Sequence, residues 1–186
     1  MREGGCAPQA VFLVGFMGAG KTSVGRALGN QLGWPFEDLD DRIQAQEERT
    51  IEEIFQQSGE AAFRRAERRA LRTLLSELGN SPRVIALGGG AFVQEENAAL
   101  LNQPGFAAVF LDAPVEELFR RCMQEASVRP LRRNREQFSE LYAERRPQYM
   151  TAGVRIVTTG KDVEAVAAEV AECLGLRPRS ARAKEL

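Results

Sequence analysis

Short apolar segments alternate with longer segments of helical periodicity along most of the chain. The short segments are rich in Val, Ile, Leu and Phe, and the longer ones space their apolar residues three and four positions apart, as amphipathic helices do. This alternation predicts an α/β fold, with a parallel sheet covered by helices on both faces. The predicted strands are Ala10–Val14, 34–38, 83–87, 107–111 and Val154–Val157, and the clearest helices are Lys21–Leu32, 50–78 and 115–123.

The length of 186 residues fits one domain of ordinary size. Two segments that combine Gly, Pro and Asn, 79–82 and 102–105, are typical of turns between elements rather than of domain linkers. Residues 177–186 carry four basic residues, one acid and almost no apolar side chain. We therefore expect a single domain over residues 1–176 and a flexible basic tail over 177–186.

The composition excludes several classes of chemistry. The chain has no histidine, which rules out a Ser-His-Asp triad and a His-ligated catalytic zinc. A net charge of −1 argues against a dedicated nucleic-acid binder, and no apolar segment approaches the roughly 20 residues that span a bilayer. Cys6, Cys122 and Cys173 lie far apart and suggest neither a disulfide framework nor a metal site. We expect a cytoplasmic protein without nucleic-acid or membrane partners.

A glycine-rich loop directly follows the first predicted strand. Residues 15–22 read Gly-Phe-Met-Gly-Ala-Gly-Lys-Thr, which satisfies the phosphate-loop pattern G-x-x-x-x-G-K-[ST] between a strand and a helix. In this pattern backbone N–H groups converge on phosphate oxygens, Lys21 reaches the β- and γ-phosphates, and the Thr22 hydroxyl can bind Mg²⁺. A Gly-rich turn followed by an accidental Lys-Thr is the alternative, and the strand-loop-helix context argues against it. The predicted ligand is a nucleoside triphosphate held by Gly18, Ala19, Gly20, Lys21, Thr22 and Ser23.

The acids near this loop indicate which class of phosphate-loop protein the chain is. The third predicted strand runs into Gly88, Gly89 and Gly90 without the Asp that many such ATPases use for Mg²⁺, and there is no Asn-Lys-x-Asp for guanine. The second strand instead runs into Asp38 and Asp40, and alternation along a strand would turn both to one side. We expect one carboxylate near Mg²⁺ and one near an acceptor hydroxyl. An acidic turn that caps a helix at 41–48 is the alternative.

These motifs resemble the shikimate kinases. That family combines a phosphate loop with F-x-D-x-D, F-R, G-G-G, R-P-L and R-x-P-x-Y, and the resemblance covers roughly residues 10–170. It implies a three-layer phosphate-loop kinase fold with a five-stranded parallel sheet in the order 2-3-1-4-5, a substrate-binding helical segment at about 38–68 and a mobile lid at about 120–135. In this chain the six motifs lie, in the order given, at residues 15–22, 36–40, 63–64, 88–90, 129–131 and 145–149.

The resemblance also implies ATP-dependent phosphorylation of the 3-hydroxyl of shikimate by a monomer, with Mg²⁺ as cofactor. Asp40, Lys21 and Arg129 would be catalytic, and Thr22 and Asp38 would serve the metal. Asp40, Arg64, Gly88, Gly89, Gly90 and Arg145 would bind shikimate, whose carboxylate suits two guanidinium groups. Arg121 and Arg129 would contact the nucleotide. Glu67, three residues after Arg64, could hold that guanidinium in place.

Other interpretations remain open for several of these residues. Arg65, Arg68 and Arg69 fit an exposed helix face with ion pairs along the same helix, residues 88–90 could form a simple turn, and Lys161 fits a solvated turn better than a nucleotide contact. Arg132 stands where the family usually has a leucine. A kinase for a sugar acid and a non-catalytic relative are the competing functions, and the intact Lys21, Asp40 and Arg129 argue against the second.

Overall fold

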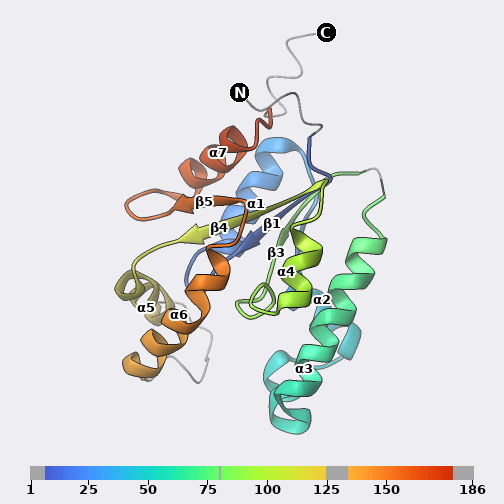
Figure 1. Ribbon diagram of the computed structural model, residues 1–186, viewed down its shortest axis with the longest axis vertical. Helices are drawn as coiled ribbons and strands as arrows, with labels where there is room; N and C mark the ends of the chain where they lie inside the picture. The colour runs from blue at the N-terminus through green and yellow to red at the C-terminus, as the bar shows by residue number, and fades with distance from the viewer. Residues whose placement is uncertain (1–6, 80, 125–133, 178–186) are drawn as a thin grey trace.

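One sheet of five parallel strands forms the centre of the molecule (Figure 1). The computed structural model describes residues 7–79, 81–124 and 134–177. The strand order β2-β3-β1-β4-β5 confirms the predicted topology, and the predicted strands differ from the observed ones by two residues at most. The strands are β1 (Ala10–Val14), β2 (Phe36–Asp38), β3 (Arg83–Ala86), β4 (Phe106–Asp112) and β5 (Val154–Val157).

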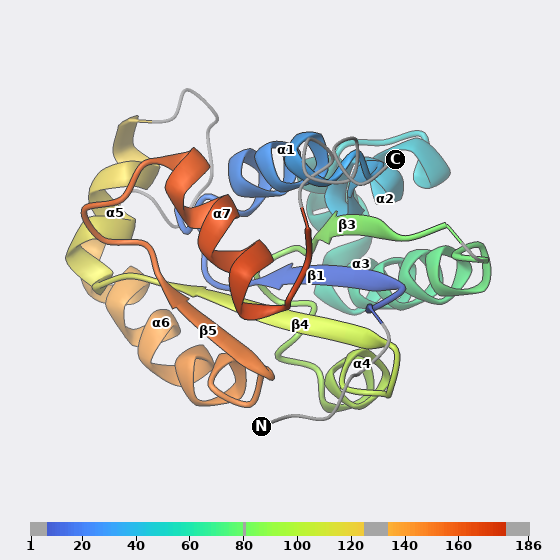
Figure 2. The ribbon, with the colours of Figure 1, turned by 90° about the horizontal axis from the view of Figure 1, so that it is seen from above.

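Helices cover both faces of the sheet, which gives the expected three layers. Helices α1 and α7 lie over one face, and α4 and α6 lie over the other (Figure 2). Helices α2 and α3 stand on one side of the carboxyl ends of the strands, and α5 and α6 stand on the other (Figure 1). None of the helices in the described ranges is long and apolar enough to cross a bilayer. The helices are α1 (Lys21–Leu32), α2 (Leu39–Glu47), α3 (Ile51–Ser76), α4 (Glu95–Leu101), α5 (Val115–Gln124), α6 (Arg135–Tyr149) and α7 (Val163–Cys173).

The central strands are buried on both faces. Every residue of β1 is buried, and β4 is buried from Ala108 to its end, as expected for parallel strands between two helical layers. Phe16 leaves β1 and packs edge-on against Phe138 and Tyr142 of α6. The core therefore extends to the carboxyl ends of the strands and fixes the loops that follow them.

The long helix α3 begins with a capping box. The Thr50 side chain accepts from the Glu53 backbone N–H, and the Glu53 carboxylate accepts from the Thr50 backbone N–H. Such a box satisfies two N–H groups that lack helical partners. Gly59 interrupts the helix with φ 77° and ψ 173°, so the part that carries Arg64 is a separate straight segment. The sequence predicted one continuous helix over 50–78, and the kink at Gly59 was not predicted.

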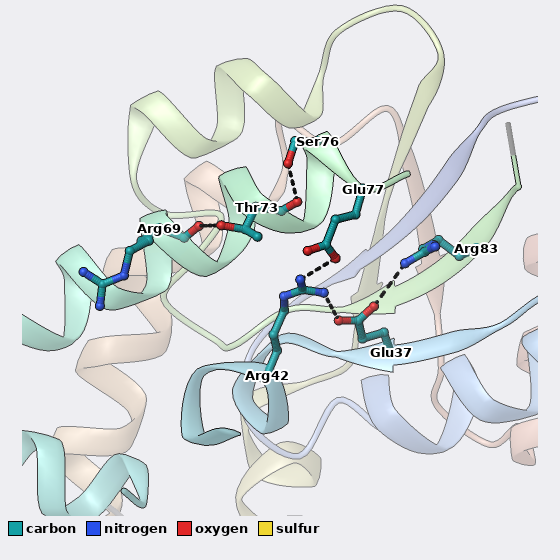
Figure 3. Close-up of polar contacts among 7 residues, drawn as sticks. All are labelled: Glu37, Arg42, Arg69, Thr73, Ser76, Glu77 and Arg83. Atoms are coloured by element: carbon teal, nitrogen blue, oxygen red, sulfur yellow. Dashed lines mark hydrogen bonds and ion pairs between the residues drawn. The ribbon is translucent and has the colours of Figure 1, made fainter. Parts of the chain in front are cut away.

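A network of charges ties α2 and α3 to the edge of the sheet (Figure 3). Arg42 of α2 donates to Glu37 of β2 and to Glu77 at the end of α3, and Arg83 of β3 also pairs with Glu37 at 3.4 Å. The Arg42 side chain is only 15% exposed. Its ion pairs are therefore less screened by water than pairs at the surface.

Candidate active site

The phosphate loop connects β1 to α1 in the predicted conformation. Gly20 is the N-cap of α1 with φ 85°, and no side chain caps the helix. Gly18 has φ 78°, and a Cβ there would lie 2.5 Å from the Leu118 carbonyl oxygen, so only glycine fits. Lys21 donates to the Phe16 carbonyl at 3.0 Å. No side chain caps the N-terminus of α1, which is the arrangement that a phosphate-binding loop requires.

The remaining predicted loop residues lie around the start of α1. Ala19 is buried, and Ser23 is exposed in the first helical turn. The Thr22 hydroxyl donates to Asp38 Oδ2 at 2.7 Å, so the end of β2 lies beside the phosphate loop. A hydroxyl and one carboxylate are hard oxygen ligands that suit Mg²⁺, which usually takes one or two protein ligands together with phosphate oxygens. Within the described ranges no group of three or more Cys, Asp or Glu side chains could hold a metal alone.

Asp38 and Asp40 reach the site by a different route from the one predicted. Strand β2 ends at Asp38, and Asp40 lies in the first turn of α2. The expected strand alternation across these two residues was therefore wrong. Asp38 is the N-cap of α2, and its Oδ1 accepts from the Asp40 backbone N–H at 3.0 Å. The alternative of a helix-capping acid is thus correct for Asp38, which caps α2 and contacts Thr22 with its two oxygens.

Gly88, Gly89 and Gly90, which follow β3, form a short loop against which the charged side chains pack, and we call this loop the glycine floor. A Cβ at Gly88 would lie 2.5 Å from Asp40 Oδ1, and a Cβ at Gly90 would lie 2.4 Å from Arg64 Nη1. At Gly89 the nearest atoms would be the Gly15 carbonyl oxygen and the Met17 nitrogen, both at 3.8 Å. Residues 88–90 therefore bring Asp40 and Arg64 together and lie beside the phosphate loop. They are more than the simple turn that the sequence left open.

Arg64 is held by acids on its own helix. Its Nη1 lies 2.9 Å from Glu67 Oε2, and its Nη2 lies 3.1 Å from Glu60 Oε1. The contact predicted between Arg64 and Glu67 is confirmed. Glu67 is completely buried, and burial raises its pKa above the usual value although Arg64 opposes this effect. Gln94 also donates to Glu67 Oε2, at 2.6 Å, and no motif in the sequence indicated this contact.

Arg145 and Tyr149 approach the glycine floor from α6. The Tyr149 hydroxyl donates to the Gly89 carbonyl, and Arg145 Nη1 lies 3.9 Å from the position of a Cβ on Gly89. The Arg145 guanidinium stands 6.0 Å above the centre of the Phe16 ring. Burial raises the pKa of Tyr149, and nearby Arg145 partly counteracts this shift. The two predicted substrate arginines, Arg64 and Arg145, thus face one short loop from opposite sides.

The nucleotide side of the site is described in part. Arg121 of α5 donates to the Thr158 hydroxyl at 3.0 Å and to Glu117, which fixes it beside the end of β5. Lys161 pairs with Glu169, as the solvated-turn interpretation expects. Arg129 and Arg132, with most of the expected lid, lie outside the described residues.

The ion pairs on the outer face of α3 differ from those expected. Arg68 pairs with Glu96 of α4, and Arg69 pairs with Glu47 of α2. The predicted pairs within the helix were therefore wrong for these two residues. Arg65 is exposed, as expected for this face.

An acid at the end of β4 organises α6 and was missed by sequence reasoning. Asp112 is 4% exposed, accepts from the Tyr142 hydroxyl at 2.9 Å, and pairs with Arg146 at 3.0 Å and Arg155 at 2.8 Å. Arg146 and Tyr142 belong to the helix that carries Arg145. The only signal in the sequence was an acid at the carboxyl end of a buried strand.

The chain resembles proteins of known activity over most of its length. The family model for shikimate kinase matches residues 17–175. The chain belongs to the shikimate kinase family. A shikimate kinase from Caulobacter vibrioides is 45% identical over 164 residues, which cover 87% of this chain and 79% of that protein. A shikimate kinase from Persephonella marina is 36% identical over 160 residues, which cover 86% and 95% of the two chains.

A solved structure supports the same family membership. The shikimate kinase from Acinetobacter baumannii in complex with shikimate superimposes with a TM-score of 0.82 at 33% identity. The match covers 90% of this chain and 93% of that one. The sheet order and the helical layers are therefore those of a shikimate kinase.

Proposed function

We propose that this protein is an active shikimate kinase that transfers the γ-phosphoryl group of ATP to the 3-hydroxyl of shikimate. One observation carries the proposal. Asp40 and Arg64 meet the loop 88–90, and the position of a Gly89 Cβ is 3.8 Å from the phosphate-loop backbone. An acceptor bound on this loop is next to a phosphate bound at α1. Family membership and the complete set of motifs support the same reaction.

The acceptor is held by charge and orientation. Shikimate carries a carboxylate, and Arg64 and Arg145 supply guanidinium groups that bind carboxylates through paired hydrogen bonds. Asp40 accepts hydrogen bonds from the ring hydroxyls, and the backbone of Gly88, Gly89 and Gly90 comes close to the ring because no side chain intervenes. Because Arg64 and Arg145 both bind the carboxylate of the acceptor, the site favours shikimate over an uncharged sugar.

The transfer step needs positioning and neutralisation of charge more than covalent help, because its transition state is loose. The 3-hydroxyl oxygen forms a bond to the γ-phosphorus while the bond from that phosphorus to the bridging oxygen of ADP breaks. The hydroxyl proton passes to Asp40. Lys21 and Arg129 neutralise the phosphate charge, and closure of the lid at about 120–135 excludes water that would otherwise accept the phosphoryl group.

ATP is bound by the phosphate loop and the residues around it. Gly18, Ala19, Gly20, Lys21, Thr22 and Ser23 surround the phosphates, and Arg121 and Arg129 contact the remainder of the nucleotide. Thr22 and Asp38 would hold Mg²⁺, which would supply positive charge to offset that of the phosphates. The domain spans 1–176, includes the substrate-binding segment 38–68, and works as a monomer in the cytoplasm.

The test is ADP release by the purified protein with Mg-ATP and three candidate acceptors: shikimate, quinate and gluconate. We expect shikimate to give a kcat/KM at least about a hundredfold above the others, because its carboxylate and its ring hydroxyls are placed to contact the two arginines and Asp40 together. Comparable turnover of gluconate would favour a sugar-acid kinase. Binding of shikimate without turnover would favour a non-catalytic relative.

A further inference from the structure

We propose that Gln94 is a positioning residue for substrate binding: it holds Glu67 so that Glu67 holds Arg64 toward the acceptor. This inference rests on the proposed function, in which Arg64 binds the shikimate carboxylate. Gln94 belongs to none of the motifs described above. It lies four residues beyond the glycine floor, at the start of α4.

The three side chains form a chain of contacts from α4 to α3. Gln94 Nε2 donates to Glu67 Oε2 at 2.6 Å, and Arg64 Nη1 donates to the same oxygen at 2.9 Å. Glu67 has no exposed surface, so water does not take the place of either donor. Both Gln94 and Arg64 therefore hold the buried carboxylate in place.

The side chain of Gln94 does not cap α4, although the residue stands at the start of that helix. Gln94 occupies the N-cap position, with φ −76° and ψ 121°, yet its side chain makes no capping hydrogen bond. N-cap positions usually hold Ser, Thr, Asp or Asn, whose short side chains reach the helix N–H groups. The longer amide of Gln94 instead spans the distance to α3, where it contacts Glu67.

Arg64 contacts two acids, Glu60 and Glu67, and Gln94 supports its contact with Glu67. Glu60 is 66% exposed and lies toward solvent, whereas Glu67 is buried beside the loop 88–90. A buried carboxylate that loses one of two donors is more costly to keep ionised. Asp40 adds a further negative charge near Glu67. Without Gln94, the pairing between Glu67 and Arg64 weakens, and Arg64 shifts toward Glu60 and away from the acceptor.

The experiment compares variants of residue 94 with a matched control. Gln94→Met keeps the length of the side chain and removes the donor, and Gln94→Glu replaces the donor with a second carboxylate. Gln31→Met is the control, because Gln31 Nε2 makes a similar exposed contact with Glu164 Oε2 at 3.0 Å, between α1 and α7 and outside the substrate-binding segment. KM for shikimate, KM for ATP, kcat and Tm are measured for each purified protein.

We expect Gln94→Met to raise KM for shikimate about five- to tenfold, with kcat and KM for ATP within about twofold of wild type. Gln94→Glu should raise KM for shikimate further, and Gln31→Met should leave both KM values unchanged. An unchanged KM for shikimate in Gln94→Met, or an equal rise in both KM values, overturns the positioning role. If the wild type itself does not turn over shikimate, the proposed function fails, and this inference fails with it.

Discussion

Replacement of Gly90 by alanine separates binding of the acceptor from binding of ATP. A Cβ at residue 90 would lie 2.4 Å from Arg64 Nη1 and 2.7 Å from Cζ. Gly90 does not have a positive φ, so alanine introduces no backbone strain. The guanidinium is the end of a flexible side chain, and it moves away. In moving it loses its 2.9 Å contact with Glu67 and its place beside the acceptor.

The size of the effect follows from the bonds that Arg64 provides. A hydrogen bond to a charged group contributes about 1.5–3 kcal/mol, and a guanidinium can make two such bonds to a carboxylate. Partial compensation by water leaves a loss of about 3 kcal/mol, or roughly a hundredfold in kcat/KM for shikimate. The free energy of unfolding falls by about 1–3 kcal/mol, because Glu67 keeps only its contact with Gln94.

The assay is steady-state ADP release with each substrate varied in turn, together with thermal unfolding. Gly153→Ala is the matched control, because the nearest atom to its Cβ would be the Ala108 carbonyl oxygen at an ordinary 3.9 Å. Gly89→Ala is a second comparison: its Cβ has no neighbour closer than 3.8 Å, so it should keep the stability of the wild type and still obstruct the acceptor. A Gly90→Ala enzyme with a normal KM for shikimate would refute the assignment of Arg64. Equal losses for both substrates would indicate general damage to the fold.

Three further predictions concern the acids of the site. Asp40→Asn should lower kcat at least about a hundredfold and leave KM for ATP nearly unchanged, since only proton acceptance is lost; wild-type turnover in the ADP assay would contradict it. Asp112→Ala should lower the free energy of unfolding by about 2 kcal/mol in urea titration, because the buried Tyr142 hydroxyl and the partly exposed Arg146 and Arg155 lose the acid they share; an unchanged midpoint would contradict it. The pKa of Glu67 is raised above the ordinary glutamate value, chiefly by burial, so KM for shikimate should rise with acidification before ordinary glutamates titrate. The free energy of unfolding should also rise over this acidic range, since a carboxyl group whose pKa is raised in the folded state adds stability as pH falls; Glu67→Gln should abolish both trends.

The sequence predicted the fold well because the central strands β1 and β4 are almost continuously apolar and because turn residues mark the breaks at 79–82 and 102–105. It located the phosphate loop because glycines and Lys21 have fixed roles at fixed spacing. The prediction for Asp40 was wrong because the sequence pattern does not show where β2 ends. The contact between the Asp38 carboxylate and the Asp40 backbone N–H caps α2 and places the start of the helix before Asp40. The order of strands came from the family resemblance, because hydrophobic periodicity does not specify which strands are neighbours.

Contacts between distant residues were the least predictable part of the site. The contact between Arg64 and Glu67 was predictable because residues three apart share a helix face. Gln94 and Asp112 reach partners 27 or more residues away in the sequence, and these contacts depend on how helices pack on the sheet. No motif distinguishes Gln94 from ordinary surface polar residues, and Asp112 is marked only by its place at the end of an apolar strand.

The charge network in Figure 3 lies where the chain leaves the sheet after β2 and returns to it at β3. Glu37 and Arg83 lie 46 residues apart in the sequence, and their side chains meet at 3.4 Å. The intervening helices α2 and α3 therefore leave the sheet and return to it at neighbouring points. Because the entropy of closing such an insertion grows slowly with its length, the insertion can be shortened, extended or exchanged while the sheet and the phosphate loop keep their geometry. The part of the acceptor site formed by Asp40 and Arg64 is in this sense a replaceable module, whereas the loop 88–90, Arg145 and the phosphate loop belong to the constant part of the fold.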